Sequence, residues 1–530
     1  MKSLLLGEKS DFYLDKSLYI SMSRAGIMHI VAISGMHISF LAGCIQLLFG
    51  RSKKSAVASI VLIWVFVILA GFPFSAIRAA IMQTICLLAP ILKRENDTGR
   101  SLLLSFIIIE LIWPKAVLDV GFQLSFGAMA GIMLFATPIY ERIHAENRIL
   151  QYFAGILSSS LSCMVFTVPL TAWHFSSIQI LSPITNIFVL FAVSLCFCGG
   201  WFSLIPGIGK LIAVPVSFVA KYILFVAKCI SAIPFSCIYT KETVALFWIL
   251  LVYLLVVVSI VFHGRWYVPL IGSLVSLALM LGISKLSYEN YQGVFSVIDV
   301  GQGQSIAVMN RGQTVLVDCG GDYSAGMNVG EYLLSCGRNS VDLLVFTHLH
   351  ADHMNGLDSL YQYVNIQEIV IPAYGDNNPD YLRLIETLAN EHGTLISYLK
   401  SDSYANIGEI HVEMYSPEEG ESENEACAIT LVSVGDYSML VTGDSSSSRE
   451  EKMIDTLQPK DLDLLIVGHH GSRSSSSLQF LQSANADIAV ISTGENRYGH
   501  PTQETLDRLE ENDYRIYRTD LNGTVEIKLS

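Results

Sequence analysis

The stretch THLHADHMNG, residues 347–356, contains three histidines and an aspartate within six consecutive positions. It follows the apolar run VDLLVF, which is typical of a short buried β-strand. At the end of such a strand, His348 and His350 project to the same side, and Asp352 and His353 come from the turn that follows. Imidazole and carboxylate ligands together suit zinc, manganese or iron rather than magnesium or calcium. The stretch therefore predicts a metal site at a strand end.

Two later strand ends offer further ligands. "MLVTGD" ends at Asp444, whose carboxylate could bridge two ions, and "LLIVGHH" ends at His469 and His470. Adjacent residues at a strand end point in opposite directions, so we expect only one histidine of this pair to bind metal. We favour His470, with His469 as the alternative. One or two divalent ions, zinc or manganese, are predicted.

The region around these motifs mixes strands and helices. From about Gly293, short apolar runs closed by Gly, Asn or Asp alternate with helical stretches such as DYLRLIETLANE. This pattern predicts two sheets between helices over residues 291–530.

The preceding half of the chain is typical of a membrane protein. Hydrophobic residues make up 52% of the chain and charged residues only 15%, and nearly all long charge-free runs precede Lys285. We expect about ten spans in residues 27–285, after a juxtamembrane segment at residues 1–26. The predicted spans are Ile27–Phe49, Ala56–Gly71, Ser75–Leu92, Ser101–Trp113, Val117–Thr137, Ile149–Trp173, Ile178–Leu204, Leu211–Ile233, Val244–Phe262 and Val268–Ile283.

The two halves differ in charge. Before Tyr291 there are 20 Lys and Arg against 11 Asp and Glu, and from Tyr291 onward there are 13 against 36. An acidic surface repels phosphate backbones, so nucleic acid would meet the second half only through a local or metal site. Basic loops follow the first, third and fifth spans, which places them in the cytoplasm. With ten spans, the second half lies on the extracytoplasmic side of the cell membrane.

Several spans carry polar residues that are costly at membrane depth. Ser34 and His37 lie in the first span, Arg78 in the third and Gln123 in the fifth. Such groups normally face a bundle interior or a water-filled cavity. Small polar residues such as Ser34 also mediate helix packing, and that alternative stays open. For His37 and Arg78 we favour a polar pathway.

The motifs as a set resemble a known family. "HLHADH", "TGD" and "HHGS" resemble the metallo-β-lactamase signature, and "VIDVGQGQS", "VLVDCGG" and "NRYGHP" are similar to its form in ComEC-type DNA-internalisation competence proteins. "MHIVAISGMHISFLAG", "GFPFSAIRAAIM" and "DVGFQLSFGAMAG" resemble the competence-channel region of that family. The resemblance implies a polytopic α-helical membrane domain followed by an α/β metallo-β-lactamase-like αββα sandwich domain.

The resemblance also implies a function and a set of site residues. The function is transport of single-stranded DNA across the cytoplasmic membrane during natural transformation, with a metal-dependent phosphodiesterase or nuclease domain that degrades the other strand. Expected partners are a DNA receptor and a cytoplasmic motor ATPase, and a homo-oligomer is an open alternative. Asp318 matches a residue that supports the metal ligands, Asp352 would orient the nucleophile, and His500 would contact substrate or act as a last ligand. The implied ligands are His348, His350, Asp352, His353, Asp444 and one of His469 and His470.

The sequence departs from the family pattern at three points. Gln304 replaces the acid of the usual "GQGD", and the metal histidine that many superfamily members carry before "TGD" is missing, with Asn424 near its position. His392 and His411 lie in that interval but at other spacings. The sequence also starts where the family's amino-terminal OB-like region would end.

Two rival functions stay open. One is a DNA channel with a catalytically degenerate metal domain, and the other is a membrane-anchored hydrolase of a small phosphodiester or a lipid. A continuous polar path through the membrane half would favour a channel over an anchor.

Overall fold

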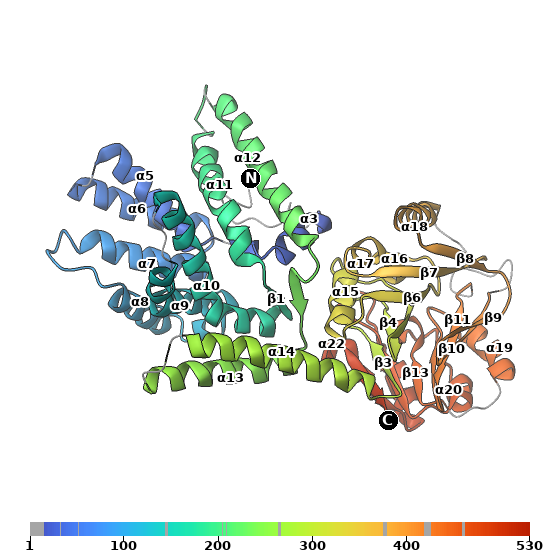
Figure 1. Cartoon of the computed structure of the whole chain (residues 1–530). Coiled ribbons are helices and arrows are strands. Elements are labelled where there is room, and N and C mark those ends of the chain that lie inside the picture. Colours follow the sequence, from blue (N-terminus) through green and yellow to red (C-terminus); the bar gives the residue numbers. More distant parts are fainter. Residues whose placement is uncertain are drawn as a thin grey trace. The chain divides into compact units, whose positions relative to one another are not determined.

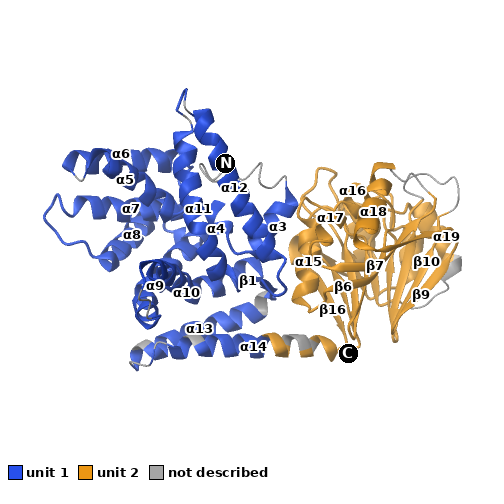
Figure 2. Ribbon diagram, turned by 45° about the horizontal axis from the view of Figure 1, so that its top comes forward, with its two compact units in different colours: residues 1–280 blue, residues 281–530 orange. Residues whose placement is uncertain are grey.

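The chain forms two compact units, residues 1–280 and residues 281–530, which we describe one at a time (Figures 1 and 2). The structure is a computed structural model. It describes residues 15–31, 33–50, 52–143, 147–203, 205–207, 209–262, 265, 267–374, 379–417, 426–457 and 462–530.

The first unit is helical, and each predicted span overlaps one of its helices. Within the described residues, four helices, α9 to α12, are long and apolar enough to cross a membrane. A two-stranded ribbon of β1 (Ser177–Gln179) and β2 (Cys237–Tyr239) interrupts the helices. The helices are α3 (Lys16–Arg24), α4 (Met28–Val31), α5 (Gly35–Phe49), α6 (Lys53–Leu69), α7 (Phe74–Leu88), α8 (Thr98–Ile112), α9 (Val120–Arg142), α10 (Arg148–Phe175), α11 (Ser182–Phe202), α12 (Gly209–Ser231), α13 (Glu242–Val261) and α14 (Tyr267–Glu289), which ends in the second unit.

The first predicted span is not one helix, which corrects the prediction. Helix α4 ends at Val31, and Ser34 is extended before α5 begins at Gly35. Two side chains bind backbone groups at this break: Ser75 Oγ donates to the carbonyl of Ile33 at 2.7 Å, and His37 Nδ1 accepts from the amide of Ser34 at 3.1 Å. Exposed backbone groups are tolerated at membrane depth only when they are satisfied in this way or line a cavity.

The second unit contains two seven-stranded sheets. Their strand orders are β16-β3-β4-β5-β6-β7-β8 and β15-β14-β13-β12-β11-β10-β9, with β5 to β8 parallel in the first sheet and β12 to β15 parallel in the second. The first sheet comprises β3 (Gly293–Val297), β4 (Ile306–Asn310), β5 (Gln313–Val317), β6 (Ser340–Val345), β7 (Asn365–Pro372), β8 (Leu395–Leu399) and β16 (Val525–Leu529). The second comprises β9 (Ser403–Ile407), β10 (Ile410–Tyr415), β11 (Ile429–Val434), β12 (Tyr437–Val441), β13 (Leu464–Ile466), β14 (Ile488–Ile491) and β15 (Arg515–Arg518).

The sheets pack face to face between helices. Phe295 and Val308 of the first sheet share one buried core with Val412 and Val432 of the second. Helices α19 (Ser447–Leu457), α20 (Leu478–Ala484) and α21 (Gln503–Glu511) pack on the outer face of the second sheet. Figure 1 shows α15 (Ala325–Ser335), α16 (Ala351–Met354), α17 (Leu357–Leu360) and α18 (Pro379–His392) on the opposite side. The predicted fold class, a helical membrane domain followed by a metallo-β-lactamase-like αββα sandwich, is confirmed.

Candidate metal centre

The predicted ligands meet at the carboxyl ends of parallel strands from both sheets. Strand β6 leads into residues 347–353, and α16 begins directly after His350, so Asp352 and His353 occupy its first turn. In the second sheet, Asp444 follows β12. His469 and His470 follow β13 in the turn η2 (Gly468–Gly471). Open α/β sheets commonly place their sites at this edge.

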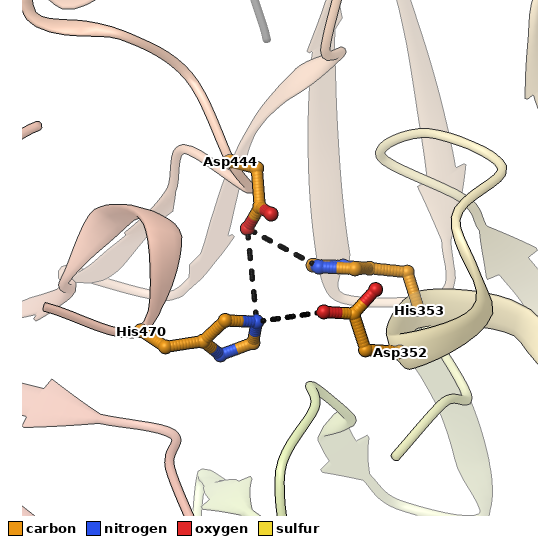
Figure 3. Close-up of side chains that lie close together, drawn as sticks. All are labelled: Asp352, His353, Asp444 and His470. Atoms are coloured by element: carbon orange, nitrogen blue, oxygen red, sulfur yellow. Dashed lines mark ion pairs between the residues drawn. The ribbon is translucent and has the colours of Figure 1, made fainter. Parts of the chain in front are cut away.

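Two groups of ligand atoms share one carboxylate. Asp352, His353, Asp444 and His470 form one group, and His348, His350 and Asp444 form the other, each with its ligand atoms within 4.8 Å of one another. Figure 3 shows Asp444 facing His353 and His470, with Asp352 beside His470. His353 Nε2 lies 3.2 Å from Asp444 Oδ1, and His348 Nε2 lies 3.9 Å from Asp444 Oδ2. The two oxygens of Asp444 thus face different groups.

The chemistry of these atoms fits divalent metal. Nε2 of His348, His353 and His470 and Oδ1 of Asp444 are buried and make no hydrogen bond, and buried polar atoms normally have partners. His470 Nε2 lies 3.4 Å from Asp352 Oδ2. Ligand atoms about 2.1 Å from one tetrahedral ion lie about 3.4 Å apart, so these separations match ligand pairs.

Neighbouring groups set the charge of each ligand. Burial and the charge of His353 lower the pKa of His348 well below its usual value, which keeps that imidazole neutral. Burial acts to raise the pKa of Asp444, but the charge of His353 beside it holds that pKa well below its usual range. Burial acts to lower the pKa of His353, but Asp444 and Asp318 raise it well above its usual value, so a bound ion would displace a proton from His353, because ligation requires neutral imidazole and ionised carboxylate.

Asp318 orients the ring of His353, which is the role that a carboxylate commonly has beside a metal-binding histidine. Asp318 is fully buried, and its Oδ2 accepts from His353 Nδ1 at 2.8 Å, which leaves His353 Nε2 facing Asp444. The same Oδ2 accepts from Thr347 Oγ1 at 2.7 Å and from Gln304 Nε2 at 2.8 Å. Sequence reasoning missed the roles of Thr347 and Gln304, although Thr347 opens the motif itself.

The histidine pair differs from the sequence expectation. His469 and His470 both have left-handed backbones, with φ of 50° and 53°, instead of continuing an extended strand. As a result both rings approach Asp444: His469 Nε2 lies 3.5 Å from Oδ2, and His470 Nε2 lies 3.9 Å from Oδ1. His470 is buried, and its Nδ1 donates to the carbonyl of Ser492 at 2.8 Å. The side chain of His469 is 25% exposed. The reasoning that the two rings must diverge was therefore wrong.

The remaining predicted residues of the second unit lie as follows. His500 is at the edge of the centre, with its ring 5.7 Å from that of His469. His392 stacks on Tyr361 at the end of α18, and His411 pairs with Glu413 on β10, so neither joins the centre. Asn424 lies outside the described residues.

The polar residues of the membrane unit form separate contacts. Ser34 Oγ lies 3.0 Å from His37 Nδ1, and Arg78 Nε donates to Ser125 Oγ at 2.8 Å. Gln123 Oε1 lies 2.8 Å from His174 Nε2. Among the residues that the structure covers, neither Arg78 nor Gln123 hydrogen-bonds to Ser34 or His37. A continuous polar path remains a prediction.

Comparison with solved structures finds proteins that align with part of this chain. A metallo-β-lactamase-fold protein, YhfI from Bacillus subtilis, aligns over 44% of this chain and all of its own, at 13% identity and a TM-score of 0.33. A new diphosphatase from the PhnP family aligns over 45% of this chain and 98% of its own, at 15% identity and a TM-score of 0.31.

Sequence comparison covers the whole chain. The metallo-beta-lactamase superfamily matches residues 298–495. ComE operon protein 3 of Bacillus subtilis is 26% identical over all of this chain and 71% of its own length. Competence protein ComA of Neisseria gonorrhoeae is 25% identical over all of this chain and 74% of its own length. The family described as competence protein matches residues 4–284, more than half of the chain. The chain therefore belongs to the competence protein family.

Proposed function

We propose that this chain imports single-stranded DNA across the cytoplasmic membrane and that its second unit is a metal-dependent phosphodiesterase which degrades the strand left outside. Family membership supports the coarser part of this proposal, a membrane protein with a role in DNA uptake. The observation that carries the finer part is the sharing of Asp444 between two ligand groups, because paired metal sites suit phosphodiester cleavage.

The proposed ligands are the members of the two groups, with zinc or manganese as the metal. A divalent ion bound there would act as a Lewis acid on a phosphodiester and increase the acidity of water. The protein contributes position: Asp318 orients His353 and the Ser492 carbonyl orients His470. Asp352, the least buried member of its group, is placed to orient an attacking water, and His500 at the rim to contact the phosphate.

A second candidate is a channel whose metal domain is catalytically degenerate. The group around His348 has three residues, whereas the group around His353 has four. If the three-residue group around His348 binds metal weakly or not at all, only one ion remains. The metal domain would then guide DNA without cutting it.

The proposed function also requires that the metal domain lies outside the cytoplasm and that other proteins deliver and pull the DNA. The basic loops of the sequence support an extracytoplasmic position for the metal domain, where the discarded strand would be. A DNA receptor would deliver the duplex, and a cytoplasmic motor ATPase would pull the strand, because no GxxxxGK[ST] loop is present in this sequence.

The test is cleavage of single- and double-stranded DNA by the full chain in detergent, with manganese or zinc added. We expect metal-dependent cutting that the double variant His348→Ala/Asp352→Ala abolishes and that the control His411→Ala retains, since His411 is outside the centre. Bound metal without cutting in the parent protein would replace this proposal with the degenerate domain.

A further inference from the structure

The break between α4 and α5 leaves a helix N-terminus inside the membrane unit. Helix α5 is 15 residues long and begins with a capping box, in which the Ser34 side chain accepts from the His37 amide and the His37 side chain accepts from the Ser34 amide. In the described part of the chain, the amides of Gly35 and Met36 donate to no acceptor. Unpaired amides and the helix dipole make such a terminus attractive to anions. Broken membrane helices in transporters direct these ends at anionic substrate groups.

Arg78 of α7 lies against this terminus. Its side chain is only 9% exposed, and a Cβ added at Gly35 would lie 3.5 Å from Arg78 Nη2. Nε donates to Ser125 Oγ, Nη1 lies 3.3 Å from Met82 Sδ, and Nη2 makes no hydrogen bond to any described residue. The guanidinium also lies 5.9 Å from the ring centroid of Phe126.

These contacts leave the charge of Arg78 without a counter-ion. No described carboxylate lies within ion-pair distance of the guanidinium, and its neighbours are a hydroxyl, a thioether and an aromatic ring. A buried charge is costly unless it is paired, and a charge within a membrane segment commonly marks a ligand or ion pathway. A Cβ on Gly35 would contact Nη2, so Nη2 and the first turn of α5, whose Gly35 and Met36 amides bond to no described acceptor, can donate to the same anion.

We propose that Arg78 and the N-terminal amides of α5 bind one phosphodiester group of a nucleic acid strand inside the membrane unit. This inference rests on the proposed DNA transport and adds the chemical group that the path recognises. A planar guanidinium donates in a fork that matches phosphate oxygens, and backbone amides bind phosphate without reading a base. The site therefore recognises the backbone of the strand and is indifferent to sequence.

The experiment measures binding of a fluorescent oligothymidylate to the full chain in phosphatidylcholine nanodiscs. The parent protein carries His348→Ala/Asp352→Ala and is kept in chelator, so that the metal centre contributes nothing. A methylphosphonate oligothymidylate, which lacks backbone charge, is the matched probe. We expect the phosphodiester strand to bind more tightly, and Arg78→Gln to weaken its binding by about tenfold or more with little effect on the uncharged strand.

A steric variant keeps the test independent of Arg78. Gly35→Ala places a methyl group beside Nη2, and we expect it to weaken binding of the phosphodiester strand. Gly43→Ala is its control, because it lies in the same helix and its Cβ would meet nothing within 4 Å. Gly35 is the first residue of the helix and Gly43 an interior one, so the thermal stability of both variants is measured as well, and weaker binding by a stably folded Gly35→Ala alone reports the site.

The outcomes separate the explanations. Equal phosphodiester binding by the parent and Arg78→Gln would overturn the inference while leaving DNA transport standing. Failure of the parent to bind either strand would remove the proposed transport and this site with it. A lipid headgroup has the same phosphate chemistry: if Arg78→Gln instead loses co-purified phosphatidylglycerol and binds the strand normally, the site holds lipid and the inference is wrong.

Discussion

The adjacent residues His469 and His470 approach the same carboxylate but differ in their surroundings. His470 is 3% exposed, belongs to a four-residue ligand group and has an unpartnered Nε2. His469 belongs to neither ligand group, although its Nε2 lies 3.5 Å from Asp444 Oδ2. We expect His470→Ala to weaken binding of one ion by about 100-fold or more, and His469→Ala to weaken it by less than about tenfold.

Metal content after dialysis against a chelator-buffered series, measured by mass spectrometry, checks this prediction. His411→Ala is the control, because it removes an imidazole outside the centre. The prediction is wrong if His469→Ala loses an ion as readily as His470→Ala does. In that case each histidine binds a different ion, and His469 is a fourth ligand of the group that contains His348 and His350.

At the residue scale, the sequence predicted most of the centre because its members are local. His348 to His353 lie within one strand end and one helical turn, so spacing alone brought them together. Spacing assigns no role to Gln304, which departs from the family pattern. In the structure its amide donates to Asp318 at 2.8 Å. That contact joins two loops whose bonded residues are fourteen positions apart in sequence. Motif spacing and hydropathy, which describe neighbouring residues, do not predict such a contact.

At the scale of elements, helix α19 holds the loop that carries the histidine pair. Glu450 of α19 is fully buried, and its Oε2 accepts from the amide of Ser476 at 2.6 Å. Burial raises the pKa of Glu450 from 4.5 to about 8, against the opposing effect of the Ser476 and Ser477 amides and Arg508. The folded chain therefore holds a proton that the unfolded chain has released, so stability falls as pH rises from about 4.5 to about 8.

Glu450→Gln should remove this pH dependence, because the amide keeps an acceptor oxygen and does not titrate. Relative to the parent, the variant should gain up to about 1.4 kcal/mol per pH unit within that window. Thermal unfolding of the metal-free full chain at several pH values checks this. The exposed Glu511→Gln is the control, and a Glu450→Gln curve parallel to the parent's would show that Glu450 is ionised in the folded chain.

The elements also show where a hydropathy pattern fails. The run Ile27–Phe49 is apolar enough overall to predict one helix, yet the chain breaks at Ser34. The break is sustained by bonds from Ser75, on another helix, and from His37. Hydropathy reports membrane depth and says nothing of such tertiary partners. The metal domain was easier to predict, because each strand is short and closed by a turn residue.

At the scale of the whole molecule, the two units have opposite charge and separate cores. The first half has an excess of Lys and Arg, the second an excess of Asp and Glu, and the buried clusters that the structure describes lie within one unit or the other. Substitutions at sites that share no partners usually have independent effects. We therefore expect strand import and strand cleavage to be separable by substitution.

Proteoliposomes that contain the full chain, enclose a motor ATPase with ATP and receive an external labelled DNA duplex provide the measurement. His348→Ala/Asp352→Ala should abolish cleavage and leave the amount of label protected inside the vesicles unchanged. Arg78→Gln should lower the protected label by about tenfold while cleavage in detergent continues at the parent rate, and the exposed Arg100→Gln should change neither. Loss of import in the metal-site variant would contradict independence, because it would mean that a strand enters the membrane unit only after its partner has been cut.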